Sequence, residues 1–327
     1  MSAYQITQRP RRNRKSAAIR DMVRETQLGV EHLMYPMFLL DGKNLRIPIA
    51  SMPGIDRMSL DAMLMEVEQC MELGLRSFVL FPAVEEALKD KGATYGLRPD
   101  NFYVKAAEAI KQRFPESVLM SDVAMDPYSS DGHDGWVENG QIINDTTLDI
   151  LSEMAVVQAQ AGFDIIGPSD MMDGRVGAIR EALDGAGYSQ TSIMSYCAKY
   201  ASAYYGPFRD ALDSAPKFGD KKTYQMDPAN ALEALREAEL DEMEGADFIM
   251  VKPALCYLDV IQRLREQTTL PIAAYNVSGE YAMLKAAAAQ GWIQYDRAMP
   301  EMLLSMRRAG ASVILTYFAK EYAQMVR

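Results

Sequence analysis

"EGADFIMVKP", residues 244–253, decides the fold class. A glycine ends an amphipathic helical pattern, and an apolar run begins within about four residues, the usual length of a loop from a helix to a strand. The same junction recurs in "ELGLRSFVLF" (72–81), "AQAGFDIIGP" (159–168) and "RAGASVILTY" (308–317). Helices and strands that alternate along a whole chain indicate right-handed βαβ units and a parallel sheet.

Eight apolar runs of strand length predict how many such units there are. They lie at residues 32–39, 77–82, 117–123, 163–170, 191–199, 247–253, 271–276 and 312–318. None alternates cleanly between apolar and polar residues, which is typical of strands covered on both faces. Eight units predict an α/β fold of the (β/α)8 TIM barrel type, which takes about 250 residues. The alternative is a doubly wound sheet, but its glycine-rich phosphate loop is missing after the first run.

The segments between these runs carry helix-end signals. Residues 59–74 open with Ser59, a good N-cap residue, and end on Gly74, which suits the position after a helix. Residues 146–162 and 227–246 follow the same pattern. We therefore predict helices over these three segments.

Composition excludes several classes of protein. The net charge of −11 argues against nucleic acid as a partner of the whole chain. No apolar run approaches the roughly 18 residues of a membrane span, and the polar N-terminus has no apolar signal region. The three cysteines lie far apart, so a disulfide framework is not expected. These features predict a cytoplasmic protein without a membrane or nucleic-acid partner.

A local basic run, "RPRRNRK" at residues 9–15, departs from this acidic balance. Such a tail can dock on another subunit or stay solvated, and basic tails in other proteins bind RNA or anionic membranes. The first interpretation is favoured here, because short basic tails are common and weakly specific.

Two lysines stand at predicted strand ends, where a barrel carries its active site. Lys199 ends the fifth run and Lys252 the sixth, and adjacent strands are about 4.8 Å apart. Burial and mutual repulsion both lower a lysine pKa, and a neutral amine forms a Schiff base with a ketone or aldehyde. In the alternative interpretation each lysine pairs with a carboxylate, Asp122 or Asp170, or reaches solvent.

Two long segments lie next to these strand ends. Residues 204–228 mix glycine, proline, aromatic and basic residues, which favours a lid whose Arg209, Lys221 and Lys222 bind an anionic substrate. A solvated loop is the alternative. Residues 122–135 are rich in aspartate, which suits Mg²⁺ or Ca²⁺ better than Zn²⁺, although such loops are more often turns.

Long motifs resemble the 5-aminolevulinate dehydratase (porphobilinogen synthase) family over essentially the whole chain. The resemblance is carried first by "MSYCAKYASAYYGPFRDA" (194–211) and "MVKPALCYLD" (250–259). Further matching stretches are "YPMFL" (35–39), "MPGIDRMS" (52–59), "SDVAMDPYSSDGHDG" (121–135), "GPSDMMDGRVGAIR" (167–180), "APKFGDKKTYQMDP" (215–228), "AYNVSGEYAM" (274–283) and "ILTYFAKE" (314–321).

The resemblance implies a lyase of tetrapyrrole biosynthesis that condenses two 5-aminolevulinate molecules into porphobilinogen and releases two waters. Lys252 matches the Schiff-base lysine of the substrate that becomes the propionate side, and Lys199 matches that of the acetate side. The matching substrate-binding residues are Arg209, Lys221 and Gln225 for the acetate-side carboxylate and Ser278 and Tyr317 for the other. The supporting active-site carboxylates are Asp122, Asp126 and Asp134.

The family's metal sites match this chain only in part. Zinc-dependent members have three cysteines where this sequence has Ala124, Asp126 and Asp134, so no structural or catalytic Zn²⁺ is expected. The resemblance instead implies the branch that uses Mg²⁺, sometimes also near the active site, and sometimes K⁺. Glu237 is the match for a glutamate that binds an allosteric Mg²⁺ through water at a subunit interface.

The resemblance also implies a domain organisation and an assembly. Residues 1–30 correspond to the family's N-terminal arm, which wraps a neighbouring subunit in a homo-octamer built from arm-exchanged dimers. Residues 31–327 correspond to the catalytic barrel.

Two rival functions stay open at this stage. A class I aldolase also uses a lysine Schiff base in a barrel, but it needs one lysine and usually a glycine-rich phosphate site, for which "YNVSGEYAM" (275–283) offers only Gly279. A barrel that has kept the fold without the chemistry is the other rival. The two strand-end lysines and the basic 204–228 segment argue against that second rival.

Overall fold

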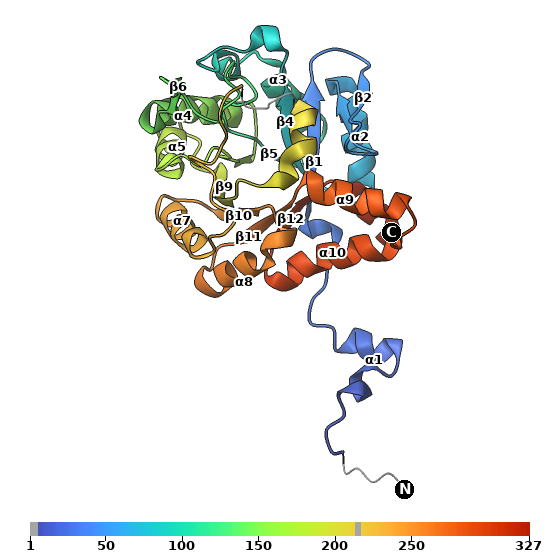
Figure 1. Cartoon of the computed structure of the whole chain (residues 1–327). Helices are drawn as coiled ribbons and strands as arrows, with labels where there is room; N and C mark the ends of the chain where they lie inside the picture. Colours follow the sequence, from blue (N-terminus) through green and yellow to red (C-terminus); the bar gives the residue numbers. More distant parts are fainter. Residues whose placement is uncertain (1–5, 213–216) are drawn as a thin grey trace.

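The computed structural model describes residues 6–212 and 217–327, and it contains a closed parallel barrel. Eight strands follow one another around it, and the last pairs with the first. In order they are β1 (Leu33–Leu40), β4 (Ser77–Ala83), β5 (Val118–Met120), β8 (Ile165–Ile166), β9 (Ser192–Lys199), β10 (Phe248–Lys252), β11 (Ile272–Asn276) and β12 (Val313–Thr316). Each strand lies within or beside one of the eight apolar runs. The predicted (β/α)8 barrel is therefore confirmed (Figure 1).

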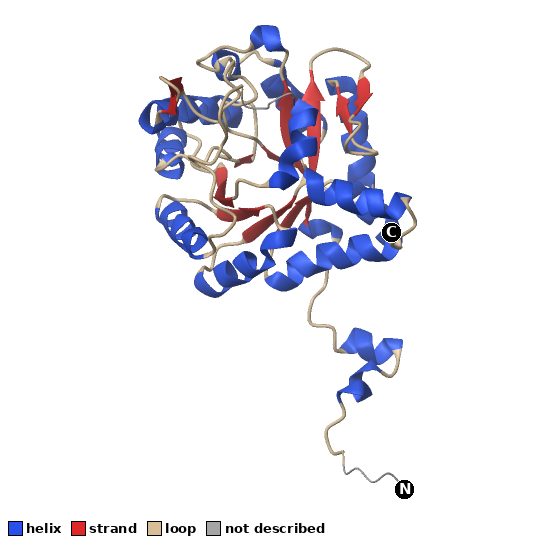
Figure 2. Ribbon diagram, in the orientation of Figure 1, coloured by secondary structure: helices blue, strands red, loops and turns tan. Residues whose placement is uncertain are grey.

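Helices surround this barrel on its outer side (Figure 2). They are α2 (Leu60–Glu72), α3 (Phe102–Arg113), α4 (Asn144–Gln160), α5 (Arg175–Gly185), α7 (Leu232–Met243), α8 (Leu258–Gln267), α9 (Ser278–Ala289), α10 (Tyr295–Ala309) and α11 (Ala319–Val326). Two short antiparallel pairs are added, β2 (Arg46–Pro48) with β3 (Asp56–Met58) and β6 (Val137–Glu138) with β7 (Gln141–Ile142). A short turn, η5 (Ala203–Tyr205), and a short helix, α6 (Gly206–Leu212), follow β9.

Two predicted helix starts differ from the structure. Ser59 precedes α2, but its hydroxyl accepts from the Leu45 backbone N–H (2.9 Å) and donates to Asp61 (2.6 Å) instead of capping the helix. The α7 helix begins at Leu232 rather than near residue 227, because Asp227 closes a turn. Its carboxylate accepts from Ala229 N–H (2.9 Å) and its carbonyl from Asn230 N–H (3.0 Å). Short polar side chains that bond their own following backbone favour such turns over helix.

The N-terminal segment projects away from the barrel (Figure 1). It carries η1 (Pro10–Arg14) and α1 (Ala17–Met22), which contain no buried residue. Contact with the barrel body includes the hydrogen bond from the Tyr322 hydroxyl to the Leu28 carbonyl (2.9 Å). Residues 1–5 of the predicted arm lie outside the described residues. Within the described part of the chain, no helix combines the length and apolar character that crossing a bilayer demands.

A buried guanidinium joins two outer helices to the barrel wall. Arg175, at the start of α5, donates to both carboxylate oxygens of Asp241 on α7, each at 3.0 Å. It also donates to the Ser195 hydroxyl (3.0 Å) and the Tyr196 carbonyl (3.2 Å) of β9. Asp170 lies 4.0 Å away on the other side. All these groups are nearly inaccessible, so the charges depend on one another for solvation.

Replacing Arg175 with methionine is therefore expected to lower the free energy of unfolding by about 3–5 kcal/mol, because Asp241 and Asp170 would stay buried without their cation. Urea denaturation measures the change. Arg113→Met is the control, since Arg113 pairs with Glu68 on the surface and such a pair contributes about 1 kcal/mol or less. Equal losses of unfolding free energy in both variants would contradict the role given to the buried Arg175 guanidinium.

Candidate active site

Two lysines lie side by side at the carboxyl ends of β9 and β10. Lys199 and Lys252 are direct register partners across this parallel pair. Both are buried, with exposed fractions of 6% and 5%. The prediction that two ammonium groups share one end of the barrel is confirmed by this register.

Aromatic rings surround the ammonium group of Lys252. Its Nζ lies 4.6 Å from the ring centre of Tyr275, 5.0 Å from Phe208, 5.1 Å from Tyr196 and 5.5 Å from Tyr205. Among the described residues, no carboxylate is within ion-pair distance of this Nζ. The rings attract a cation but replace little of the hydration that burial removes.

Burial accordingly lowers the pKa of Lys252 to about 7, and repulsion by Lys199 acts in the same direction. Asp122, Asp126 and Asp134 oppose the shift without cancelling it. A large fraction of Lys252 is then a neutral amine at neutral pH. The backbone of this residue is held in place, because its carbonyl accepts from Tyr200 N–H (2.9 Å) and the Tyr205 hydroxyl (3.0 Å).

Lys199 has a different environment, made of oxygen atoms. Its Nζ donates to the Ser169 carbonyl and lies 3.7 Å from the Asp134 carboxylate. The alternative that the lysines pair with Asp122 or Asp170 is therefore not what the structure shows. Asp170 faces Arg175 instead, at 4.0 Å. One lysine thus has a carboxylate neighbour and the other has rings.

Asp122 is buried close to both lysines without a direct ion pair. Burial raises the pKa of its carboxyl, against the influence of Lys252 and Lys199. Its Oδ1 has no hydrogen-bond partner among the described residues. A carboxyl with a raised pKa and a free oxygen is suited to take up and give back a proton.

Asp126 and Asp134 hold a third ammonium group, that of Lys221. Its Nζ lies 3.1 Å from Asp126 Oδ2 and 3.1 Å from Asp134 Oδ1. Burial and the neighbouring Asp134 raise the pKa of Asp126 to about 7. Burial also acts on Asp134, but Lys199 and Lys221 outweigh it and hold that pKa at about 2. Ala124, the remaining position of the family's zinc site, is buried and offers no ligand atom.

The 204–228 segment covers these groups, although its residues 213–216 lie outside the described residues. The α6 helix inserts Phe208 against the barrel aromatics, with ring centres 5.0 Å from Phe81 and 5.7 Å from Phe38. The next residue, Arg209, has no ion pair or hydrogen bond among the described residues. Its guanidinium is therefore free to bind an anion.

The second half of this segment is attached to the aspartate-rich loop. His133 is buried, and its two ring nitrogens lie 3.0 Å from the Phe218 carbonyl and 3.1 Å from the Tyr224 hydroxyl. Because a carbonyl can only accept, Nε2 carries a proton in this arrangement. Gln225 is buried in the same segment, and its Oε1 has no partner among the described residues.

Ser278 and Tyr317 lie at the ends of the last two strands. The Ser278 hydroxyl accepts from the Phe208 N–H (3.0 Å), which brings α6 to the start of α9. The Tyr317 hydroxyl is 3.2 Å from that of Tyr275, one of the rings around Lys252. The structure thus places both residues near the predicted Lys252 subsite.

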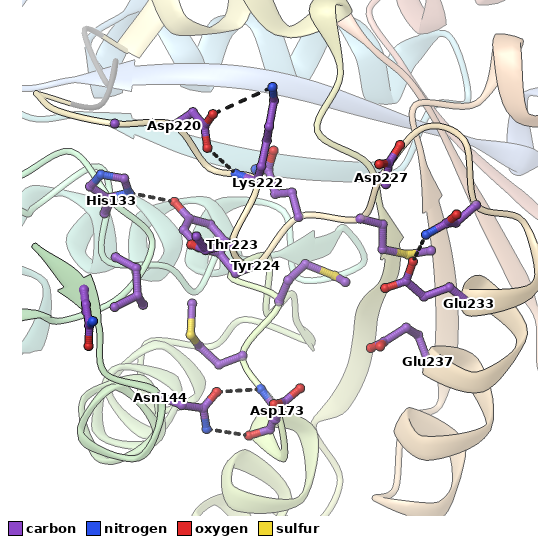
Figure 3. Close-up of a pocket in the computed structure, with 18 of the residues that line it drawn as sticks. His133, Asn144, Asp173, Asp220, Lys222, Thr223, Tyr224, Asp227, Glu233 and Glu237 are labelled. Carbon is purple, nitrogen blue, oxygen red and sulfur yellow. Dashed lines mark hydrogen bonds and ion pairs between the residues drawn. The ribbon is translucent and has the colours of Figure 1, made fainter.

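Glu237 lies apart from the lysines, in a cavity of about 920 Å³. Glu233 and Glu237 project from α7 toward this cavity, with Asp173 opposite (Figure 3). Burial raises the pKa of Glu237, and Asp173 and Glu233 raise it further, against the effect of Arg175. Within the described ranges, no three acidic, cysteine or histidine side chains meet closely enough to hold a metal ion directly. A hydrated cation fits such an acidic cavity, because Mg²⁺ usually keeps several of its waters.

Three aromatic residues around Lys252 were not predicted from the sequence. Tyr196 lies on β9, whereas Tyr205 and Phe208 come from the segment after it. The stretch "YYGPF" (204–208) belongs to the segment that its mixed composition alone predicts to be a lid. Its aromatic residues at three-residue spacing were the available signal, since residues three apart share a helical face.

Comparisons with known proteins agree with this geometry. The family model described as "Delta-aminolevulinic acid dehydratase" matches residues 7–325. The delta-aminolevulinic acid dehydratase of Bradyrhizobium diazoefficiens is 53% identical over 99% of this chain and 92% of its own length. The chloroplastic one of Physcomitrium patens is 55% identical over 97% of this chain and 73% of its own. The solved structure of the Toxoplasma gondii protein, in complex with the reaction product porphobilinogen, superposes with a TM-score of 0.96 at 52% identity, covering 98% of this chain and 92% of that one.

The pKa of Lys252 predicts how its reactivity depends on pH. Reductive alkylation by a small aldehyde should rise with pH through a midpoint near 7, because only the deprotonated amine attacks a carbonyl. Mass mapping of the Lys252 peptide measures it. In Lys199→Met the midpoint should move upward, since a repelling charge is removed. A wild-type midpoint near the ordinary lysine value of about 10.4 would contradict the assignment.

Proposed function

Because the chain belongs to the delta-aminolevulinic acid dehydratase family, we propose that it condenses two molecules of 5-aminolevulinate into porphobilinogen and releases two waters. The pair of buried lysines in register at the ends of β9 and β10 is the observation that supports this most. A class I aldolase would need only one of them. The product is a pyrrole, so the reaction belongs to the synthesis of tetrapyrroles.

In this proposal Lys252 attacks the ketone of the first substrate. Its low pKa supplies the neutral amine, and the surrounding rings exclude water from the Schiff base that forms. One water leaves as the imine forms. Lys252 is released when the bond that this carbon forms to the second substrate molecule replaces its bond to the lysine nitrogen. Asp122, close to both lysines, is suited to carry the protons of these steps.

Lys199 then holds the second substrate on the acetate side. Asp134 and the Ser169 carbonyl hold its ammonium group in place at the carboxyl end of β9. Lys199 must lose its proton before it attacks the ketone, and among the described residues Asp134 is the carboxylate within ion-pair distance of its Nζ, at 3.7 Å. With both ketones fixed on adjacent strands, the carbon–carbon and carbon–nitrogen bonds form between groups already brought together.

The carboxylates of the two substrates require separate anchors. We assign Arg209, Lys221 and Gln225 to the acetate-side carboxylate and Ser278 and Tyr317 to the other. Arg209 has no partner among the described residues, which supports its role. Lys221 is ion-paired with Asp126 and Asp134, so in this arrangement it contributes positive charge rather than an open donor.

We assign the chain to the branch of the family that needs Mg²⁺ rather than Zn²⁺. The support is chemical: the family's three cysteine positions hold an alanine and two aspartates that are paired with Lys221. Glu237 would bind the allosteric Mg²⁺ through its water shell, and the acidic cavity supplies a field that favours a dication. A requirement for K⁺ stays a prediction of the resemblance.

Assembly into a homo-octamer of arm-exchanged dimers is part of the same proposal. The N-terminal segment carries Met22 and Val23 with exposed fractions of 78% and 43%, and its hydrogen bonds to the barrel body include those at Gln27 and Leu28. Apolar side chains exposed on a projecting arm are suited to pack against a neighbouring subunit.

Lys252→Ala is expected to abolish turnover and the adduct that borohydride traps with 5-aminolevulinate. Lys252→Arg should fail as well, because guanidinium stays protonated and is not nucleophilic. Activity assays and mass mapping of the modified lysine test this. More than a few per cent of wild-type activity in either variant would show that another residue is the nucleophile.

Arg209→Ala is expected to raise the KM for product formation by roughly ten- to a hundredfold, since a charge-assisted bond to a carboxylate contributes on the order of 1.5–3 kcal/mol. The adduct at Lys252 should survive at saturating substrate, because Arg209 serves the other subsite. Both quantities are measured on one preparation. An equal collapse of the two would mean that Arg209 supports the fold or the first subsite.

Zinc-selective chelation is expected to leave activity nearly intact, whereas removal of Mg²⁺ should lower it. The rise of Tm on adding Mg²⁺ should disappear in Glu237→Gln and persist in Glu239→Gln, a change at an exposed position of the same helix. Tightly bound Zn²⁺ in active protein, found by metal analysis, would contradict the zinc-free assignment. An unchanged Mg²⁺ effect in Glu237→Gln would contradict the Mg²⁺ site.

A further inference from the structure

A fully buried carboxylate lies beneath the active site at the start of α9. Glu280 has no exposed surface. One of its oxygens accepts from the Leu255 N–H (2.8 Å), and the other accepts from the Asn276 amide (2.9 Å) and the Val277 N–H (3.0 Å). Every one of these partners is a donor, so the ionised carboxylate satisfies them all without needing a proton of its own.

These bonds continue to a third strand end through Asn276. The Asn276 side-chain oxygen accepts from the Thr316 hydroxyl (2.8 Å). That hydroxyl in turn accepts from the Phe318 N–H (3.2 Å). One connected set of hydrogen bonds therefore joins the ends of β10, β11 and β12, and its links are buried except for the partly buried one at Leu255.

Each point of contact lies within three positions of a residue of the Lys252 subsite. Leu255 follows Lys252 by three positions, Val277 directly precedes Ser278, and Thr316 directly precedes Tyr317. None of the hydrogen bonds of Glu280 goes to the side chains of these site residues. Among the described residues, the hydrogen bonds of this carboxylate thus go to backbone and amide groups close in sequence to the site residues.

The charge of Glu280 is stabilised by these donors, and the Cys256 backbone N–H acts in the same direction. Burial raises its pKa to about 7, while the Asn276 amide and the Leu255 and Val277 N–H groups oppose that rise. No lysine or arginine is ion-paired with it among the described residues. A buried carboxylate without a cation is costly, and hydrogen bonds from fixed donors are what make it tolerable.

From this geometry we infer that Glu280 is a positioning residue for the subsite of the first substrate: it fixes Lys252, Ser278 and Tyr317 relative to one another. The inference rests on the proposed function, because the subsite is the one assigned there. Glu280 itself touches no reacting atom in this assignment. Its removal should therefore weaken capture of the first substrate instead of removing the nucleophile.

Glu280→Gln is the sharpest variant, since it keeps the size of the side chain. In either orientation its amide NH₂ would face N–H donors, at Leu255 on one side or at Asn276 and Val277 on the other. We expect the 5-aminolevulinate concentration that half-saturates borohydride trapping at Lys252 to rise by about tenfold. At saturating substrate the yield of adduct should recover. KM for product formation should rise more than kcat falls.

Glu66→Gln is the matched control. Glu66 is also a buried glutamate, but it pairs with Arg46 of β2 (3.0 Å) and Lys320 of α11 (2.7 Å), and among the described residues it has no ion pair with a residue of the site. It should lower Tm and leave half-saturation of trapping unchanged. If Glu66→Gln shifted trapping as much as Glu280→Gln, the effect would be general destabilisation and the inference would be wrong.

Thr316→Val covers the case in which Glu280→Gln does not fold. It removes only the far end of the hydrogen-bonded set, and half-saturation should rise by about threefold. If half-saturation of trapping in Glu280→Gln equals that of the wild-type protein, the inference is wrong and the proposed function stays intact. The same holds for Thr316→Val if Glu280→Gln does not fold. No adduct at Lys252 in the wild-type protein would overturn the proposed function and this inference with it.

Discussion

The register of β9 against β10 is the constraint on which the site depends. It places two ammonium groups on adjacent strand ends, in a region closed to solvent. Neither charge can be stable there without compensation, because the cost of removing an ion from water amounts to several kcal/mol. Three kinds of group offset this desolvation free energy: the three carboxylates, the aromatic rings and the segment that covers the lysines.

The compensation is distributed unequally, and this gives the lysines different chemistry. Asp134 lies beside Lys199 and also binds Lys221, whereas Lys252 is left with aromatic faces. A cation that has only rings around it loses its proton more easily than one beside a carboxylate. The same fold therefore contains one amine that is nucleophilic near neutral pH and a second that lies beside a carboxylate.

Sequence reasoning reached the barrel and both lysines because their signals are local. Continuous apolar runs mark strands covered on two faces, and a charged residue at the end of such a run stands out. The pairing of Lys221 with Asp126 and Asp134 could not be predicted in the same way, since it joins residues about 90 positions apart. Arg175 and Glu280 were missed for a related reason: a charged residue near a helix start usually lies at the surface, and only the folded chain shows these two to be buried.

Residues 217–227 form a wall between two acidic regions. Lys221 points inward to Asp126 and Asp134, while its neighbour Lys222 is exposed and lines the outer cavity, which also contains Asp173, Glu233 and Glu237. Two consecutive lysines of one short stretch therefore face opposite sides, Lys221 the buried aspartates and Lys222 the outer cavity. Asp126 and Asp134 hold the segment inward through Lys221, whereas the ammonium group of Lys222 lies 3.8 Å from Asp220 of the same segment. Because charges separated by a thin protein wall are screened less than exposed ones, a cation bound in the cavity would change the forces on the segment that covers the catalytic lysines.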